Sequence, residues 1–200
     1  MQRREFLKRA GCFVASASVV GLWGCDSDDD AETPASAGSV SFPQGVASGD
    51  PQPNAVVLWT RAAPTKGDAA VSLRLEVSES EDFKTLIVKD MVQATQQTDF
   101  TVRVYVEDLS PDRFYYYRFV AGVDKSRVGR TRTAPEADAD IEPHFAWVSC
   151  QDYAANFYGS YRRMLNEDEA APQDAQLHFV LHLGDFIYET RNADFMTSTT

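Results

Sequence analysis

The sequence predicts a β-sandwich followed by the start of an α/β domain. Apolar and polar residues alternate repeatedly over residues 40–134, as they do in strands with one buried face. After residue 143 the pattern changes to two short apolar runs separated by a helical segment. Such runs are typical of parallel strands that are covered on both faces of a sheet.

The composition indicates a globular protein with limited room. The chain has 200 residues, of which 44% are hydrophobic and 12% aromatic, as expected for a folded protein. A domain usually takes roughly 100–200 residues, so one large domain fits, or one small domain and part of another. The net charge of -11 disfavours contact with nucleic-acid phosphates, so we expect no nucleic-acid-binding domain. Because no run of about 20 apolar residues occurs, we also expect no membrane-spanning segment in the mature protein.

Residues 1–25 are expected to be an export signal. A basic cluster lies before a short apolar stretch at residues 10–23. The cluster consists of Arg3, Arg4, Lys8 and Arg9. This order is typical of a secretory signal, and the stretch is too short for a membrane span. Residues 3–8 (RREFLK) resemble the bacterial twin-arginine signal, which implies export of the folded protein by the twin-arginine machinery. The alternative is a basic amphipathic first helix of the fold.

The end of this segment resembles the lipobox of bacterial lipoproteins. In the run Leu22-Trp23-Gly24-Cys25, cleavage before Cys25 would leave an N-terminal cysteine for acylation. Acyl chains would anchor the protein, since each buried methylene contributes about 0.8 kcal/mol. Simple cleavage nearby is the alternative. We therefore expect a periplasmic protein or a lipoprotein on the outer side of the cytoplasmic membrane.

Removal of residues 1–24 changes both the charge and the cysteine content. Four basic side chains and one acidic side chain are lost, so the net charge falls from -11 to -14. Cys150 is then the one cysteine in the folded body, which excludes a disulfide framework. Residues 26–39 contain a run of aspartates followed by small residues, and we interpret them as a disordered tether rather than a calcium site.

Several strands are expected within residues 40–134. Val71, Leu73, Leu75 and Val77 alternate with polar residues, and residues 102–106 and 115–119 follow the same pattern. Residues 55–59 form a continuous apolar run that fits a buried strand, whereas residues 127–133 fit a polar edge strand. Six or seven such strands predict a sandwich of the immunoglobulin or fibronectin III type.

One turn supports this interpretation. Leu109, Pro111 and Tyr115 have the spacing of the corner in fibronectin type III domains, where the tyrosine hydroxyl bonds back to the corner backbone. We therefore expect Tyr115 to be structural. The alternative is that the aromatic residues of 115–119 form a carbohydrate-binding platform.

Residues 135–142 are expected to be a linker, and residues 143–200 the start of an α/β domain. The apolar runs at 145–148 and 179–183 predict two strands, and residues 157–165 predict a helix with Phe157, Tyr161, Met164 and Leu165 on one side. Strand, helix and strand in this order form one βαβ unit. Active sites of such sheets lie beyond the carboxyl ends of the strands.

Potential ligands follow both predicted strands. The first strand is followed by Cys150 and Asp152, and the second by Asp185 and Tyr188, with Gly184 allowing a sharp turn. A thiolate, a carboxylate and a phenolate suit a metal such as iron better than magnesium alone. The structural alternatives are a buried Cys150, a turn-forming Asp185 and a Tyr188 that only packs. His182, between two leucines, is expected to be a hydrogen-bonded strand residue rather than a ligand.

These motifs resemble those of a known enzyme family. Gly-Asp-x-x-Tyr at 184–188 resembles the second metal motif of purple-acid-phosphatase-like metallophosphatases. Ser-Cys-Gln-Asp-Tyr at 149–153 is similar to the variant first motif of the alkaline phosphatase D family. Residues 42–51 and 57–61 also resemble the opening of that family's N-terminal sandwich module.

The resemblance implies an exported, metal-dependent phosphoesterase that acts on phosphate mono- or diesters. A separate alternative is another hydrolase with the same first two motifs that acts on diesters or phospholipids. Cys150, Asp185 and Tyr188 would hold Fe3+, and Asp185 would bridge to a second divalent ion, calcium. Asp152 stands where the usual first motif has a histidine and is a further candidate metal ligand. The ions would convert water into the attacking hydroxide, so we expect no side chain of this chain to act as the nucleophile.

The later motifs of the family, an asparagine loop and histidine-rich loops, do not occur between Thr190 and Thr200. We therefore expect this chain to be an N-terminal fragment of a longer enzyme and inactive alone. The competing hypothesis is a surface-anchored immunoglobulin-like binding module without catalytic activity.

Overall fold

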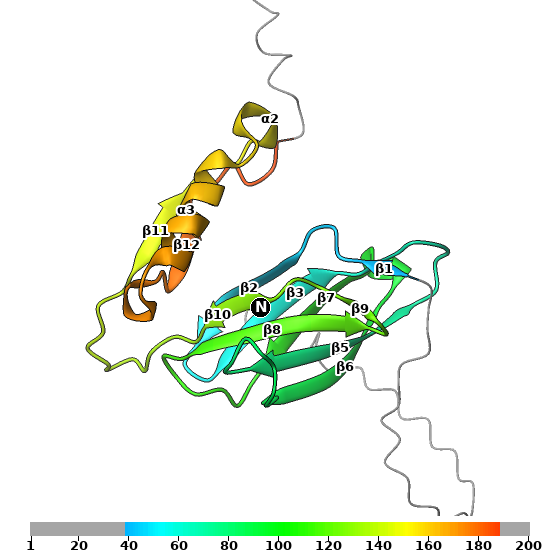
Figure 1. Cartoon of the computed structure of the whole chain (residues 1–200), viewed down its shortest axis with the longest axis horizontal. Helices are drawn as coiled ribbons and strands as arrows, with labels where there is room; N and C mark the ends of the chain where they lie inside the picture. The colour runs from blue at the N-terminus through cyan, green and yellow to red at the C-terminus, as the bar shows by residue number, and fades with distance from the viewer. Residues whose placement is uncertain (1–38, 189–200) are drawn as a thin grey trace, which may run out of the picture. The chain divides into compact units, whose positions relative to one another are not determined.

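The structure, a computed structural model, describes residues 39–188 (Figure 1), without the side chains of residues 155 and 156. The predictions for the export signal, the lipobox and nearly all of the tether therefore lie outside the described residues, as does the segment 189–200.

Ten strands and one short 3-10 helix make up the first part of the described chain. The helix is η1 (Gln96–Thr98). The strands are β1 (Val40–Ser41), β2 (Val46–Gln52), β3 (Ala55–Arg61), β4 (Ala63–Pro64), β5 (Val71–Ser78), β6 (Val88–Ala94), β7 (Thr101–Val106), β8 (Phe114–Ala121), β9 (Asp124–Lys125) and β10 (Gly129–Arg132).

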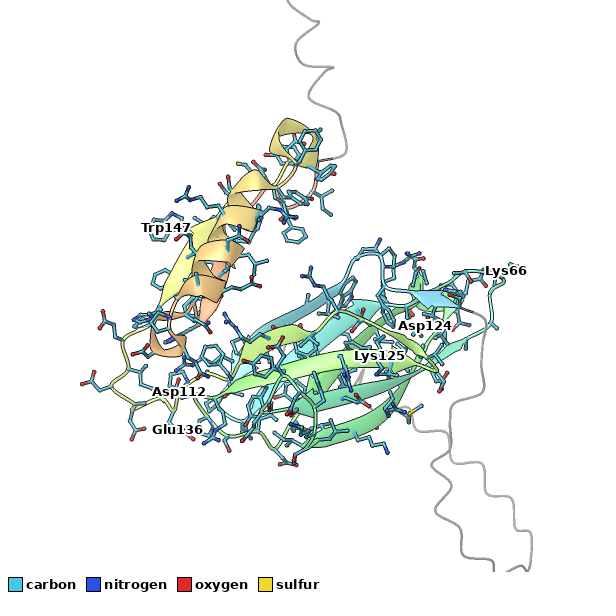
Figure 2. The ribbon with its side chains drawn as sticks, viewed as in Figure 1. Lys66, Asp112, Asp124, Lys125, Glu136 and Trp147 are labelled. Carbon is cyan, nitrogen blue, oxygen red and sulfur yellow. The ribbon has the colours of Figure 1, made fainter. Side chains whose placement is uncertain are left out.

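These strands form two antiparallel sheets and a small β1–β4 pair. One sheet has the order β2-β3-β7, and the other has the order β10-β8-β5-β6 with β9 on β8 (Figure 1). Their inward-facing side chains form one hydrophobic core, which includes Leu58 of β3, Val102 of β7, Leu73 of β5 and Phe119 of β8. Figure 2 shows Asp124 of β9 close to β1, where its carboxylate accepts a hydrogen bond from the Val40 amide at 2.8 Å. The predicted β-sandwich is confirmed.

The strand patterns read from the sequence match this sandwich. Val71, Leu73, Leu75 and Val77 are all buried on β5. Residues 129–132 form β10 at the end of the strand order, as expected for a polar edge strand. The alternation arises because successive side chains of a strand point to opposite faces of the sheet.

The corner before β8 also has its predicted structure. The Tyr115 hydroxyl accepts a hydrogen bond from the Ser110 amide at 2.8 Å, which ties the turn to the strand. Tyr115, Tyr117 and Phe119 are buried in the core. The alternative of a carbohydrate platform built from these rings is therefore wrong, because their faces are not accessible.

The second part of the described chain is a βαβ unit. It contains β11 (Phe145–Val148), α2 (Tyr153–Asn156), α3 (Gly159–Ala170), the 3-10 helix η2 (Gln173–Ala175) and β12 (Phe179–His182). β11 and β12 are parallel, with Phe145 opposite Phe179 and Val148 opposite His182. The α/β start predicted after the sandwich is thus confirmed. Among the helices within residues 39–188, none is long and apolar enough to cross a membrane.

The helix begins later than predicted. Phe157 and Tyr158 have φ angles of 53° and 58°, so the backbone turns left-handed between α2 and α3. A left-handed residue cannot continue a right-handed helix. Phe157 consequently does not share the helix face with Tyr161 and Met164, as the sequence pattern predicts, and its side chain is exposed.

The two parallel strands are less covered than their apolar sequences predict. Trp147 projects from β11 with 67% of its surface exposed (Figure 2), and Leu181 of β12 is also exposed. A two-stranded sheet with one long helix between its strands leaves apolar surface open within the described residues.

Candidate metal centre

The parallel pairing brings the two predicted ligand loops to one edge of the sheet. Past the strand ends, the Leu183 amide donates to the Val148 carbonyl at 2.8 Å, and the Cys150 amide donates to the Gly184 carbonyl at 3.1 Å. The Gln151 amide then donates to the Asp185 carbonyl at 3.0 Å. The hydrogen bonds between the two strands therefore continue into the loops that follow them, and they hold Cys150 next to Asp185.

Both loops contain unusual backbone conformations. Cys150 has φ 58°, Asp185 has φ 53° and Gly184 has φ 134°. The left-handed region is uncommon for residues with a Cβ atom, and it costs on the order of 1–3 kcal/mol at Cys150 and at Asp185. Such conformations cluster at functional sites, where they direct side chains that a regular strand would direct elsewhere.

Two ligand-type side chains converge on a carboxylate oxygen of the third. The Cys150 thiol donates to Asp185 Oδ2 with a sulfur–oxygen distance of 3.3 Å. The Tyr188 hydroxyl donates to the same oxygen at 3.1 Å. Cys150 is exposed and Tyr188 is 41% exposed, so both groups are accessible. The structure thus brings together Cys150, Asp185 and Tyr188, the three residues predicted as ligands.

The surroundings favour the protonated form of the Tyr188 hydroxyl. The hydrogen bond with Cys150, partial desolvation and the Asp185 carboxylate together raise the pKa of Tyr188 above its usual value. A bound cation would reverse this effect, because it favours the charged form of each ligand. A thiol, a carboxylate and a phenol in mutual contact fit an iron ion, since these donors match its charge and softness.

Asp152 has a structural role in this arrangement. Its Oδ1 atom accepts a hydrogen bond from the Ala154 amide at 2.9 Å and caps the N-terminus of α2. Its role as a further metal ligand stays a prediction. Within residues 39–188, no group of three or more His, Cys, Asp or Glu side chains is close enough to hold a metal ion. The candidate centre therefore depends on a tyrosine as its third donor.

The sequence patterns do not identify two residues that support the ligand loops. The Gln151 side chain donates to the Phe186 carbonyl at 2.9 Å and so links the two loops again. The Tyr161 hydroxyl of α3 lies 3.3 Å from His182 Nε2. The helical pattern assigns Tyr161 only to an apolar face. As predicted, His182 is hydrogen-bonded in its strand.

Comparison with known proteins identifies the family. The family described as "PhoD-like phosphatase, N-terminal domain" matches residues 27–135, and the family described as "PhoD-like phosphatase" matches residues 145–200. The chain belongs to the PhoD-like phosphatase family. The family resemblance predicted from the motifs is thus confirmed.

Individual relatives of this PhoD-like chain support the same family membership. It is 36% identical over 206 residues to "Alkaline phosphatase D" of Bacillus subtilis (strain 168), covering 98% of this chain and 34% of that protein. A solved structure, "Structure of PhoD", is 36% identical with a TM-score of 0.66, covering 81% of this chain and 30% of the other. The chain therefore spans about a third of the length of these relatives. A sensor domain of the anti-sigma factor RsgI4 in Pseudobacteroides cellulosolvens is 11% identical over 50% of this chain and 99% of its own, with a TM-score of 0.41, too low to support an argument.

Proposed function

We propose that this protein is an exported, metal-dependent phosphatase that hydrolyses phosphate mono- or diesters. The observation that carries the proposal is the convergence of the Cys150 thiol and the Tyr188 hydroxyl on Asp185 Oδ2. Membership of the PhoD-like phosphatase family and the relation to an alkaline phosphatase support a hydrolase acting on phosphate esters.

Cys150, Asp185 and Tyr188 would hold iron, and Asp185 would bridge to a second divalent ion, calcium. When bound, such ions polarise the phosphoryl group and lower the pKa of an attacking water. Side chains of this chain would hold and orient these ions rather than attack the substrate. We place the remaining ligands of the second ion in the part of such an enzyme that this chain does not match, because the chain covers 34% of its relative.

Export by the twin-arginine machinery completes the proposal. The paired Arg3 and Arg4 within the sequence RREFLK support this route, and Cys25 offers a site for a lipid anchor. The twin-arginine route carries folded proteins, which allows the metal to be taken up before export. The protein would then act in the periplasm or at the outer side of the cytoplasmic membrane.

Replacement of both Arg3 and Arg4 by lysine tests the export route. The double variant keeps the positive charge but removes the arginine pair, so we expect the precursor to accumulate inside the cell. Arg9→Lys is the matched control and should be exported normally. Cell fractionation with an antibody against the protein measures this, and equal export of all three proteins would contradict the proposed route.

Tyr188→Phe tests the metal centre in the protein expressed from its complete reading frame. The wild-type protein, purified with iron, should show a visible phenolate-to-iron absorption band and hydrolyse 4-nitrophenyl phosphate or its diester analogue. The variant should lose or shift the band, and turnover should fall at least about 10-fold, because one ligand is removed.

Tyr105→Phe is the matched control, since Tyr105 lies on β7 and is 50% exposed, similar to Tyr188 at 41%. It should keep both the band and the activity. A colourless, iron-free wild-type protein without turnover would instead favour the non-catalytic binding module.

A further inference from the structure

His182 uses both nitrogens of its ring at the end of β12. Its Nδ1 atom lies 3.3 Å from the Gly184 amide, which donates to it. Its Nε2 atom lies 3.3 Å from the Tyr161 hydroxyl of α3. The ring is also held by an edge-on contact with Phe186, at a centroid distance of 4.9 Å.

These contacts define which nitrogen carries the proton. A backbone amide can only donate, so Nδ1 must be the unprotonated acceptor. The hydrogen of the neutral ring then lies on Nε2 and is donated to the Tyr161 oxygen. A single tautomer of His182 therefore satisfies both neighbours.

The His182 ring accepts a hydrogen bond from Gly184, the residue at the turn after β12. Its carbonyl accepts from the Cys150 amide at 3.1 Å, and its amide donates to His182, so both of its backbone polar groups are engaged. Its φ of 134° is open to glycine and strained for other residues. Glycine is also free to adopt many other conformations, so this turn needs fixed partners to stay in one of them.

We propose that His182 is a positioning residue for the metal-binding loops. A chain of hydrogen bonds runs from Tyr161 through His182 to Gly184 and on to Cys150, and it connects α3 with both loops. It holds the turn that places Asp185 beside Cys150 and Tyr188. This inference rests on the proposed metal centre. It adds that α3, through Tyr161 and His182, helps to hold the loops that carry the ligands.

Two substitutions at His182 separate positioning from packing. Asparagine keeps an acceptor, Oδ1, near the place of Nδ1, whereas leucine keeps the bulk but has no acceptor. In the protein expressed from its complete reading frame, His182→Leu should weaken iron affinity at least about 10-fold, as measured by competition with a chelator. His182→Asn should stay within about 3-fold of the wild type. Equal losses in both variants would refute the positioning role.

Nuclear magnetic resonance of the metal-free protein gives a readout that does not depend on iron. With 15N-labelled histidine, the shifts of His182 should report an unprotonated Nδ1 and a protonated Nε2. Tyr161→Phe removes only the hydroxyl and keeps the ring, so it should change the Nε2 shift of His182. This measurement remains possible if the His182→Leu variant does not fold.

The two readouts distinguish failure of this inference from failure of the proposed function. A protonated Nδ1, or an unchanged Nε2 shift in Tyr161→Phe, overturns the positioning role even where iron binds. Absence of iron binding in the wild type overturns the metal centre, while the tautomer still decides the role of His182.

Discussion

At the scale of single residues, Glu76 shows how the sandwich holds a buried charge. This carboxylate of β5 is 5% exposed, and it contacts Arg118 Nε at 2.6 Å and Arg74 Nε at 2.8 Å. Burial alone would raise its pKa, but the hydrogen bonds and charges of the two arginines outweigh burial, so the pKa of Glu76 is lowered. The charged form is therefore favoured in the folded state.

Glu76→Gln should reduce both the stability and its dependence on pH. Because the folded pKa lies below the unfolded value, the charge of Glu76 stabilises the fold above about pH 4.5, and this contribution is lost as pH falls through the folded pKa. We expect a loss of about 2 kcal/mol at pH 7, since two arginines lose a buried partner. Urea unfolding at pH 7 and at pH 4 measures the difference.

Glu79→Gln is the control, because Glu79 contacts one arginine, Arg113, and its side chain is 50% exposed. It should cost less than about 0.5 kcal/mol. The same loss at both pH values for Glu76→Gln would contradict this account.

Local patterns predicted residues whose partners are close in the sequence, and missed those that depend on tertiary contacts. Tyr115 bonds to the Ser110 amide, five residues away, within a recognisable corner. Cys150 and Asp185 were expected to meet because parallel strands end at the same edge. The contacts of Gln151 with Phe186 and of Tyr161 with His182 depend on the exact loop and helix positions, which no spacing reveals.

At the scale of elements, the pairing of β10 with β8 depends on a glycine. Gly129 lies directly opposite Tyr117, and a Cβ atom at Gly129 would be 2.4 Å from Tyr117 Cζ. Tyr117 is buried and cannot move without disturbing the core. The edge strand can approach this ring only where it has no side chain.

Gly129→Ala should therefore destabilise the sandwich by about 2 kcal/mol through overpacking. Gly49→Ala on β2 is the matched control, because a Cβ atom there meets nothing within 4 Å. Thermal unfolding followed by circular dichroism measures both variants. Equal melting temperatures for the two would show that Tyr117 adjusts without cost.

The elements themselves could largely be read from the sequence, with one instructive error. Alternation identified the long strands because one face of each lies on the core. The helix boundary was wrong because Phe157 and Tyr158 are left-handed, a conformation that glycine or asparagine would have signalled. Aromatic residues give no such signal, so the break between α2 and α3 was not predictable.

At the scale of the whole molecule, the hydrophobic core is unevenly distributed along the described chain. Among residues 39–188, the buried hydrophobic side chains all lie between Val40 and Ala121. The aromatic and aliphatic residues of β11 and β12 are instead partly exposed. Burial of apolar surface is the main source of stability, so the two parts differ in their resistance to opening.

Hydrogen exchange should reveal this difference in the 200-residue chain. The amides of β5 and β8, paired on both sides and packed on the core, should open only by global unfolding. The amides of β11 and β12 should exchange at least about 100-fold faster, because their opening exposes little additional apolar surface. Exchange followed by mass spectrometry at rising urea concentrations distinguishes the two. If peptides from β11 and β12 lost protection only together with those of β5 and β8, the βαβ unit would share the stability of the sandwich, and its ligand loops would be held as firmly as the core.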